Sequence, residues 1–150
     1  MWKDLSIYIN STCKINNGNN NQNKCNDDNN IPCKVVEIAI GKFFEVSDNL
    51  SSFDNINFVS TDIDPGRKDV VFDDITNPNM DIYKNTKIIY SIRPPQELQS
   101  YIEEIVNKIG AILIIKPFFN EDLAIELDMD LINYKKAVFY QSMNTKNLYL

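Results

Sequence analysis

The chain has 150 residues, 43% of them hydrophobic, which is enough for one domain that buries about two-thirds of its unfolded surface around a single core. Fifteen Lys and Arg residues stand against 21 Asp and Glu, and the net charge of -6 argues against general affinity for nucleic acid or an anionic membrane. The longest apolar runs are only as long as strands, and residues 1–10 lack the basic and apolar regions of a signal peptide, so a cytosolic protein is expected.

The N-terminal part combines a helical pattern with a polar tract. Trp2, Leu5 and Ile9 recur at near-helical spacing, which predicts an amphipathic helix from residue 2 to about 14. Residues 16–30 contain nine Asn and no large apolar side chain, so they have little to bury against the entropy of ordering. We predict a flexible insertion here, a solvated spacer rather than a binding loop.

The available side chains limit the chemistry. The chain contains no histidine, and its three cysteines, Cys13, Cys25 and Cys33, form no CxxC pair, so no metal site is expected. Because a cytosolic setting disfavours disulfides, we expect reduced, mostly structural thiols. Without histidine, Ser-His-Asp and Cys-His nucleophiles are excluded, and any proton transfer must use carboxylates, Lys, Tyr or water.

The most informative stretch is KVVEIAIG, residues 34–41, an apolar run that closes on Gly41 and predicts a central strand opening a nucleotide-binding turn. A second strand over residues 56–62 ends in Asp62, 21 positions after Gly41. That is the spacing at which a βαβ nucleotide site places a carboxylate on ribose hydroxyls. Glu37 interrupts the apolar run, and it is either part of this site or a buried carboxylate that caps the amides of the turn.

The remaining elements alternate as a doubly wound sheet requires. A short helix is expected over residues 42–50, a longer one runs from Pro94-Pro95 to a stop at Gly110, and single strands are expected at 70–72, 87–92 and 111–116. Residues 137–141 and 147–150 are predicted to form a closing antiparallel hairpin. The fold prediction is one α/β domain over residues 1–150, three-layered and Rossmann-like, with a mostly parallel sheet of strand order 3-2-1-4-5.

Five segments succeed one another as in a known group: EIAIGKF, STDIDP, FDDIT, IYSIRPP and GAILIIKP. With them the chain resembles uncharacterised protein family 0146, an archaeal group, over nearly everything after Cys33. The group in turn resembles a small S-adenosylmethionine-dependent methyltransferase fold. This resemblance implies an adenosine-containing ligand, and it does not supply an activity.

The resemblance assigns roles to four positions. Glu37 matches the acid that opens the glycine turn of methyltransferases, and Gly41 matches the middle glycine of that turn. Asp62 matches the ribose-binding acid, and Asp74 matches the acid that meets the adenine amino group. The alternative for both aspartates is a purely structural role, in which they accept hydrogen bonds within their loops. The turn departs from the family pattern, because Ala39 and Phe43 stand where glycines are usual.

Candidate catalytic residues follow the fourth strand. Ser91 stands where amino-group methyltransferases have Asn or Asp before Pro-Pro and an aromatic residue, but the order here is Ser-Ile-Arg-Pro-Pro. Tyr90 and Arg93 are the other candidates, although a tyrosine at this position is more often a core or rim residue than a general base. The departure leaves methylation of an amide or base nitrogen open.

Cations follow four of the predicted strands, namely Lys42, Arg67, Arg93 and Lys116. Ligands of open α/β sheets bind outside the carboxyl ends of the strands, so these side chains predict a positive rim for a small anionic molecule or a nucleotide. Both arginines of the chain lie on this rim, where a planar fork can grip phosphate or carboxylate. The alternative is coincidence and solvated lysines.

The function expected from these observations is binding of S-adenosylmethionine or a related adenosine-containing ligand, with methyl transfer to a small anionic acceptor. The alternative is a catalytically silent nucleotide-sensing or partner-binding module. An NAD-dependent oxidoreductase is a third hypothesis, which the glycine-poor turn disfavours.

Overall fold

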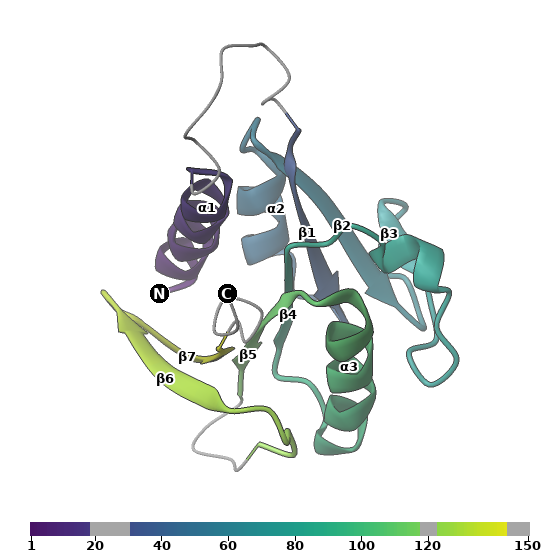
Figure 1. The fold of residues 1–150 in the computed structure, drawn as a ribbon. Coiled ribbons are helices and arrows are strands. Elements are labelled where there is room, and N and C mark those ends of the chain that lie inside the picture. Colours follow the sequence, from purple (N-terminus) through teal and green to yellow (C-terminus); the bar gives the residue numbers. More distant parts are fainter. Residues whose placement is uncertain (19–30, 118–122, 144–150) are drawn as a thin grey trace.

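The computed structural model describes residues 1–18, 31–117 and 123–143. These residues form one seven-stranded sheet of order β3-β2-β1-β4-β5-β7-β6 (Figure 1). The strands are β1 (Cys33–Ile38), β2 (Ile56–Asp62), β3 (Val70–Phe72), β4 (Ile88–Ile92), β5 (Ile112–Lys116), β6 (Met129–Tyr134) and β7 (Ala137–Ser142). The first five are parallel, whereas β7 runs antiparallel to both of its neighbours. The mixed α/β class, the order 3-2-1-4-5 and the presence of a C-terminal hairpin are confirmed.

Helices cover both faces of the sheet. α1 (Trp2–Gly18) and α2 (Glu45–Ser51) pack on one face, and α3 (Gln96–Ile109) with the short 3-10 helix η1 (Met80–Tyr83) packs on the other (Figure 1). Alternate side chains of β1 serve the two cores, with Val35 on the α1 side and Val36 and Ile38 on the α3 side. A strand buried on both faces has to be almost continuously apolar, as this one is.

The helices depart from the predicted boundaries at two places. The second helix begins at Glu45 rather than at residue 42, because residues 42–44 complete the turn after β1. α1 continues to Gly18, so the first three residues of the predicted insertion are helical, and the rest of that insertion lies outside the described residues. The end of α3 is as predicted, since Gly110 caps it in the left-handed conformation with φ 78°.

The C-terminal hairpin uses a different pair of strands from the predicted pair. β7 occupies the expected residues, but its partner is β6, and residues 147–150 lie outside the described part of the chain. The register joins Tyr134 to Ala137, which leaves Lys135 and Lys136 as the turn. Lys135 takes a positive φ of 52°, as a two-residue hairpin turn requires. The prediction missed this turn because neither residue is Gly, Asn or Asp.

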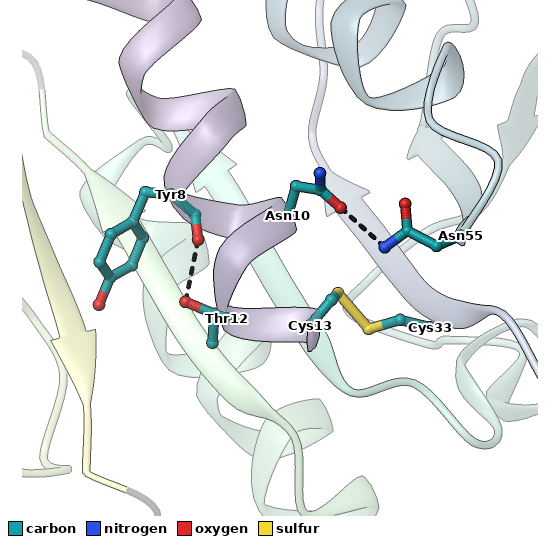
Figure 2. Close-up of a disulfide and its surroundings, with 6 residues drawn as sticks. All are labelled: Tyr8, Asn10, Thr12, Cys13, Cys33 and Asn55. Carbon is teal, nitrogen blue, oxygen red and sulfur yellow. Dashed lines mark hydrogen bonds between the residues drawn. A yellow bond between two sulfur atoms is a disulfide. The ribbon is translucent and has the colours of Figure 1, made fainter. Parts of the chain in front are cut away.

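The prediction of reduced thiols is wrong for two of the three cysteines. Cys13 on α1 and Cys33 at the start of β1 form a disulfide, with their Cα atoms 5.8 Å apart (Figure 2). The helix crosses the sheet beside the start of β1, and the side chain of Asn55 donates a hydrogen bond to Asn10 at 2.8 Å nearby. Cysteine spacing along the chain does not reveal this proximity, because the helix that creates it packs from outside the sheet. Cys25 lies outside the described residues.

Candidate functional site

A cavity of about 360 Å³ opens at the carboxyl ends of the first parallel strands. Its lining comes from the turn after β1, the end of β2, the segment after β3 and the start of α3. The lining residues are Ala39, Gly41, Thr61, Asp62, Ile63, Asp73, Asp74, Ile75, Thr76, Pro95 and Leu98. Three of the four predicted cofactor-binding residues, Gly41, Asp62 and Asp74, therefore lie in one cavity, as parallel strands ending at one edge of the sheet imply.

The turn after β1 is bent by two residues with positive φ. Gly41 has φ 62°, and Ala39 has φ 58°. An alanine in the left-handed region is strained, and such strain persists only where the surrounding structure enforces it. A Cβ atom on Gly41 would meet nothing within 4 Å, so the glycine is required for its backbone conformation rather than for lack of space.

Asp62, which lines the cavity, accepts hydrogen bonds from the backbone of two turns. Its Oδ2 accepts a hydrogen bond from the Gly41 N–H at 2.8 Å, and its Oδ1 accepts one from the Asp64 N–H at 2.8 Å. An ionised carboxylate offers about four acceptor positions, so each oxygen can accept a second donor. The hydrogen bonds within the loops that the alternative interpretation expected are present. They orient the carboxylate and leave some of its acceptor positions unoccupied by them.

The segment after β3 places two aspartates in different environments. Asp74 Oδ1 accepts hydrogen bonds from the amide and the hydroxyl of Thr76, at 3.0 and 2.7 Å. Asp73 is buried, and its two oxygens accept from the Asn79 N–H at 2.9 Å and from the Tyr83 hydroxyl at 2.5 Å. Burial and the neighbouring Asp73 raise the pKa of Tyr83, so the phenol stays a donor. The sequence prediction missed Asp73, although its place beside Asp74 after a strand was a usable signal.

Apolar side chains form much of the remaining cavity wall. Ile75 is buried, whereas Ile63 is 62% exposed although it directly follows Asp62. Leu98 contributes from the first turn of α3. An apolar wall beside two carboxylates suits a flat heterocycle that carries polar groups at its edge.

Glu37 lies away from this cavity, on the α1 side of the sheet. It pairs with Tyr90 across β1 and β4, and its Oε1 accepts a hydrogen bond from the Tyr90 hydroxyl at 2.6 Å. Its Oε2 is buried and has no hydrogen-bond partner among the described residues. Burial raises the pKa of Glu37 to about 8, and burial together with the adjacent acid raises the pKa of Tyr90. A neutral carboxylic acid is the form that this environment favours at neutral pH.

The catalytic candidates on β4, Ser91 and Tyr90, are also buried and hydrogen-bonded. The Ser91 hydroxyl donates to the Ile38 carbonyl at 2.7 Å across the neighbouring strands, and the serine side chain is fully buried. Tyr90 is fully buried beside Phe58, with their ring centroids 6.4 Å apart. Both side chains therefore contribute to the contacts among β1, β2 and β4.

The four cations of the predicted rim have unequal surroundings. The Arg67 guanidinium bonds Asp48 at 2.7 and 3.3 Å and Asp69 at 2.9 and 3.1 Å, and it lies over the Phe44 ring. Its fork is thus engaged by two carboxylates of the protein. Lys42 is exposed on the turn after β1.

Arg93 and Lys116 are neighbours at the ends of β4 and β5. The Arg93 N–H donates to the Lys116 carbonyl at 2.6 Å. Partial burial, and after it the positive charge of Arg93, lowers the pKa of Lys116. The Arg93 guanidinium lies 5.5 Å from the centre of the Trp2 ring, which packs on Phe43 at 4.8 Å. The sequence prediction missed Trp2, because α1 is distant in sequence from the strands it approaches.

The comparisons with known proteins confirm the resemblance to the archaeal family. The model of a family described as "Uncharacterised protein family (UPF0146)" matches residues 20–144. A UPF0146 protein of Methanothermobacter thermautotrophicus is 38% identical over 141 residues, which cover 94% of each chain. One of Methanocaldococcus jannaschii is 40% identical over 115 residues, which cover 71% of this chain and 81% of the relative. The chain therefore belongs to the uncharacterised protein family UPF0146.

Proposed function

We propose that the protein binds S-adenosylmethionine or a related adenosine-containing ligand in this cavity, as a Rossmann-like, methyltransferase-like domain. The observation that carries the proposal is that Gly41, Asp62 and Asp74 line one cavity at the carboxyl edge of the sheet. The volume of about 360 Å³ lies within the range of roughly 300–1,000 Å³ that is usual for small-molecule sites.

Each side chain has a role in the proposed complex. The remaining acceptor positions of Asp62 suit the two ribose hydroxyls, and its bond to the Gly41 amide holds it in place. Asp74 suits the adenine amino group, which donates hydrogen bonds. Ile63 and Leu98 supply apolar surface for the base, which accounts for the exposure of Ile63 in the free protein.

Methyl transfer is a separate question from binding. Transfer by proximity and alignment alone is worth about 7–11 kcal/mol in favourable cases, so it does not require a histidine. The burial of Ser91 and Tyr90, each with a hydrogen-bond partner, favours the second candidate function, a nucleotide-sensing module that binds without turnover. Turnover with small anionic acceptors distinguishes an enzyme from a sensor.

The test measures thermal unfolding with S-adenosylmethionine, with its demethylated product and with NAD. At about 100 times its dissociation constant, a ligand of the folded state adds about 2.7 kcal/mol to the free energy of unfolding. We expect this shift with the two adenosyl ligands, and we expect Asp62→Ala or Asp74→Ala to abolish it. The matched control is Asp130→Ala, an exposed aspartate on β6 at the far edge of the sheet.

Two results would contradict the proposal. A cooperatively folded wild-type protein that none of these ligands stabilises does not bind an adenosyl cofactor. A shift with NAD alone assigns the cavity to a nicotinamide cofactor and supports the oxidoreductase hypothesis instead.

A further inference from the structure

The loop between β2 and β3, residues 63–69, borders the cavity. Its first residue, Ile63, lines the cavity, and the Asp64 N–H donates a hydrogen bond to Asp62 Oδ1 at 2.8 Å. Every residue of this loop is exposed except Arg67, which is partly buried. An exposed loop has little local stability unless a side chain attaches it to a neighbouring element. The contacts of Arg67 therefore decide how firmly the loop is held.

The Arg67 side chain reaches from the loop to α2 and to the residue before it. Its two terminal nitrogens donate to the two carboxylate oxygens of Asp48 on α2, at 2.7 and 3.3 Å. Its guanidinium carbon lies 4.0 Å from the centre of the Phe44 ring, directly before α2. Asp69, within the loop, accepts hydrogen bonds from the same guanidinium at 2.9 and 3.1 Å. We refer to these four residues as the Arg67 cluster.

This cluster is more favourable than an ordinary surface ion pair. Exposed pairs contribute little on average, because two long side chains lose freedom for a weak attraction in water. A guanidinium that bonds both oxygens of a carboxylate and stacks on an aromatic ring is held in one orientation by several contacts. The bonds to Asp69 stay inside the loop, whereas Asp48 and Phe44 belong to a different part of the fold. The latter two contacts therefore attach the loop to the rest of the domain.

The same loop also lies against the turn that contains Gly41. A Cβ atom on Gly66 would lie 3.5 Å from the Phe44 ring and 3.7 Å from the Gly41 carbonyl oxygen. The Gly41 N–H donates to Asp62 Oδ2 at 2.8 Å, and the second donor to Asp62 is the amide of Asp64 in the loop. One donor thus comes from the turn and the other from the loop. Both donors stay in place only while the loop and the turn keep their relative positions.

We infer that Arg67 is a positioning residue for the cavity. By attaching the loop to Asp48 and Phe44, it keeps Asp62 and Ile63 in the arrangement that binds the ligand. The inference rests on the proposed function for its effect on affinity, and it deepens that function by naming what controls the affinity. A loop that is already held does not have to be ordered on binding, which strengthens binding. Arg67 acts without contacting the ligand, because carboxylates of the protein bond its guanidinium.

The first measurement needs no ligand. Amide hydrogen exchange, followed by NMR, reports how often the hydrogen bonds from the Gly41 and Asp64 amides to Asp62 open. Arg67→Ala and Asp48→Asn should each speed the exchange of these two amides about three- to tenfold, the factor that loss of one favourable ion pair and one ring contact gives. Unchanged rates in both variants would overturn the inference.

The second measurement is the affinity for the demethylated product of S-adenosylmethionine, by calorimetry at a temperature where every variant is folded. This ligand has no net charge at neutral pH, so loss of a cation does not remove a net attraction. Arg67→Ala and Asp48→Asn should raise the dissociation constant about three- to tenfold, because only part of the free protein then has the loop in the binding arrangement. Arg67→Lys should lie between, since an ammonium keeps the charge without the planar fork.

Lys108→Ala is the matched control. It removes another ion pair, from Lys108 to exposed Glu104 at 3.3 Å, in the last turn of α3. Its amide exchange at Gly41 and Asp64 and its ligand affinity should both equal those of the wild type. A loss of affinity as large as that of Arg67→Ala would show that any lost ion pair weakens binding.

The outcomes separate the inference from the proposed function. Equal ligand affinity in the wild type, Arg67→Ala and Asp48→Asn overturns the inference and leaves the adenosine cavity in place, because a contribution to stability alone does not change the affinity of the folded protein. A folded wild type that binds no nucleoside contradicts the proposed function instead. The exchange rates of the Gly41 and Asp64 amides then still decide whether Arg67 orients Asp62.

Discussion

At the scale of single residues, Glu37 and Asp62 show how two carboxylates at neighbouring strand ends acquire different chemistry. Asp62 is held by two backbone amides at the edge of the sheet, and these hydrogen bonds fix the direction of its two oxygens. Glu37 is enclosed between β1 and the helices, with one donor from Tyr90 and one oxygen without a partner among the described residues. The first is suited to accept hydrogen bonds from a ligand, and the second is a titrating group inside the core.

The buried acid makes stability depend on pH. The pKa of Glu37 rises from an ordinary 4.5 to about 8 in the folded protein. Between these two values the folded state holds a proton that the unfolded state has lost, so stability falls as pH rises, by on the order of 1.4 kcal/mol per pH unit. Above the folded pKa both states are ionised and the loss ends.

Glu37→Gln removes this titration while it keeps the shape of the side chain. We expect the variant to gain stability relative to the wild type as pH rises from about 5 to about 8, measured as the free energy of unfolding in denaturant. Glu104→Gln, on the exposed surface of α3, should follow the wild-type pH profile. Equal pH slopes for Glu37→Gln and the wild type would show that Glu37 is not the titrating group.

The residue scale also shows what the sequence could predict of the site. Gly41, Asp62 and Asp74 follow parallel strands, and the shared edge of the sheet brings such positions together whatever the details of packing. Whether Glu37 lines the cavity depends on which face of β1 its side chain takes. It lies on the α1 side, where it accepts a hydrogen bond from Tyr90 on β4. Alternation along a strand buried on both faces gives no sequence signal for that choice.

At the scale of elements, α1 is the helix whose covalent attachment to the sheet could not be predicted from the sequence. Its apolar stripe predicted a helix on one sheet face, and Leu5 and Ile9 do enter that core. The disulfide between Cys13 and Cys33 then fastens its C-terminal half to the start of β1 (Figure 2). Only one strand of the C-terminal hairpin, β7, was predicted. The turn before it was missed because Lys135 has a positive φ but is not a residue type that indicates a turn.

The disulfide should contribute measurably to stability. It spans a sequence separation of 20 residues, for which the chain-entropy model gives about 3 kcal/mol. Addition of a dithiol reductant should lower the free energy of unfolding by about that amount, as should Cys13→Ala or Cys33→Ala without reductant. Cys25→Ser should keep the full response to reductant. A response that disappears in Cys25→Ser would mean that another pair of cysteines forms the bridge.

At the scale of the whole molecule, the sheet needs a cover on each face, and the covering helices come from different parts of the chain. α3 arises between β4 and β5, within the segment that the family model matches, whereas α1 precedes that segment. The same helix places Trp2 beside the Arg93 guanidinium and packs against α2, β1, β6 and β7. The periodicity of strands and helices predicted the layers, but only the packed structure shows that α1 reaches from β1 in the middle of the sheet to β7 and β6 at one edge.

Deletion of residues 1–18 should therefore unfold the protein even though the family model begins after them. Full burial of a Leu or Ile side chain is worth about 1.5–3 kcal/mol, and the bridge about 3 kcal/mol more, so the loss rivals a net stability of ~5–15 kcal/mol. We expect the shortened chain to lose its cooperative thermal transition. Replacement of residues 19–30 by a short Gly-Ser linker is the matched control, and it should cost less than about 1 kcal/mol because loop length enters closure entropy only logarithmically. A shortened chain that melts cooperatively near the wild-type temperature would show that the sheet is stable without α1 on that face.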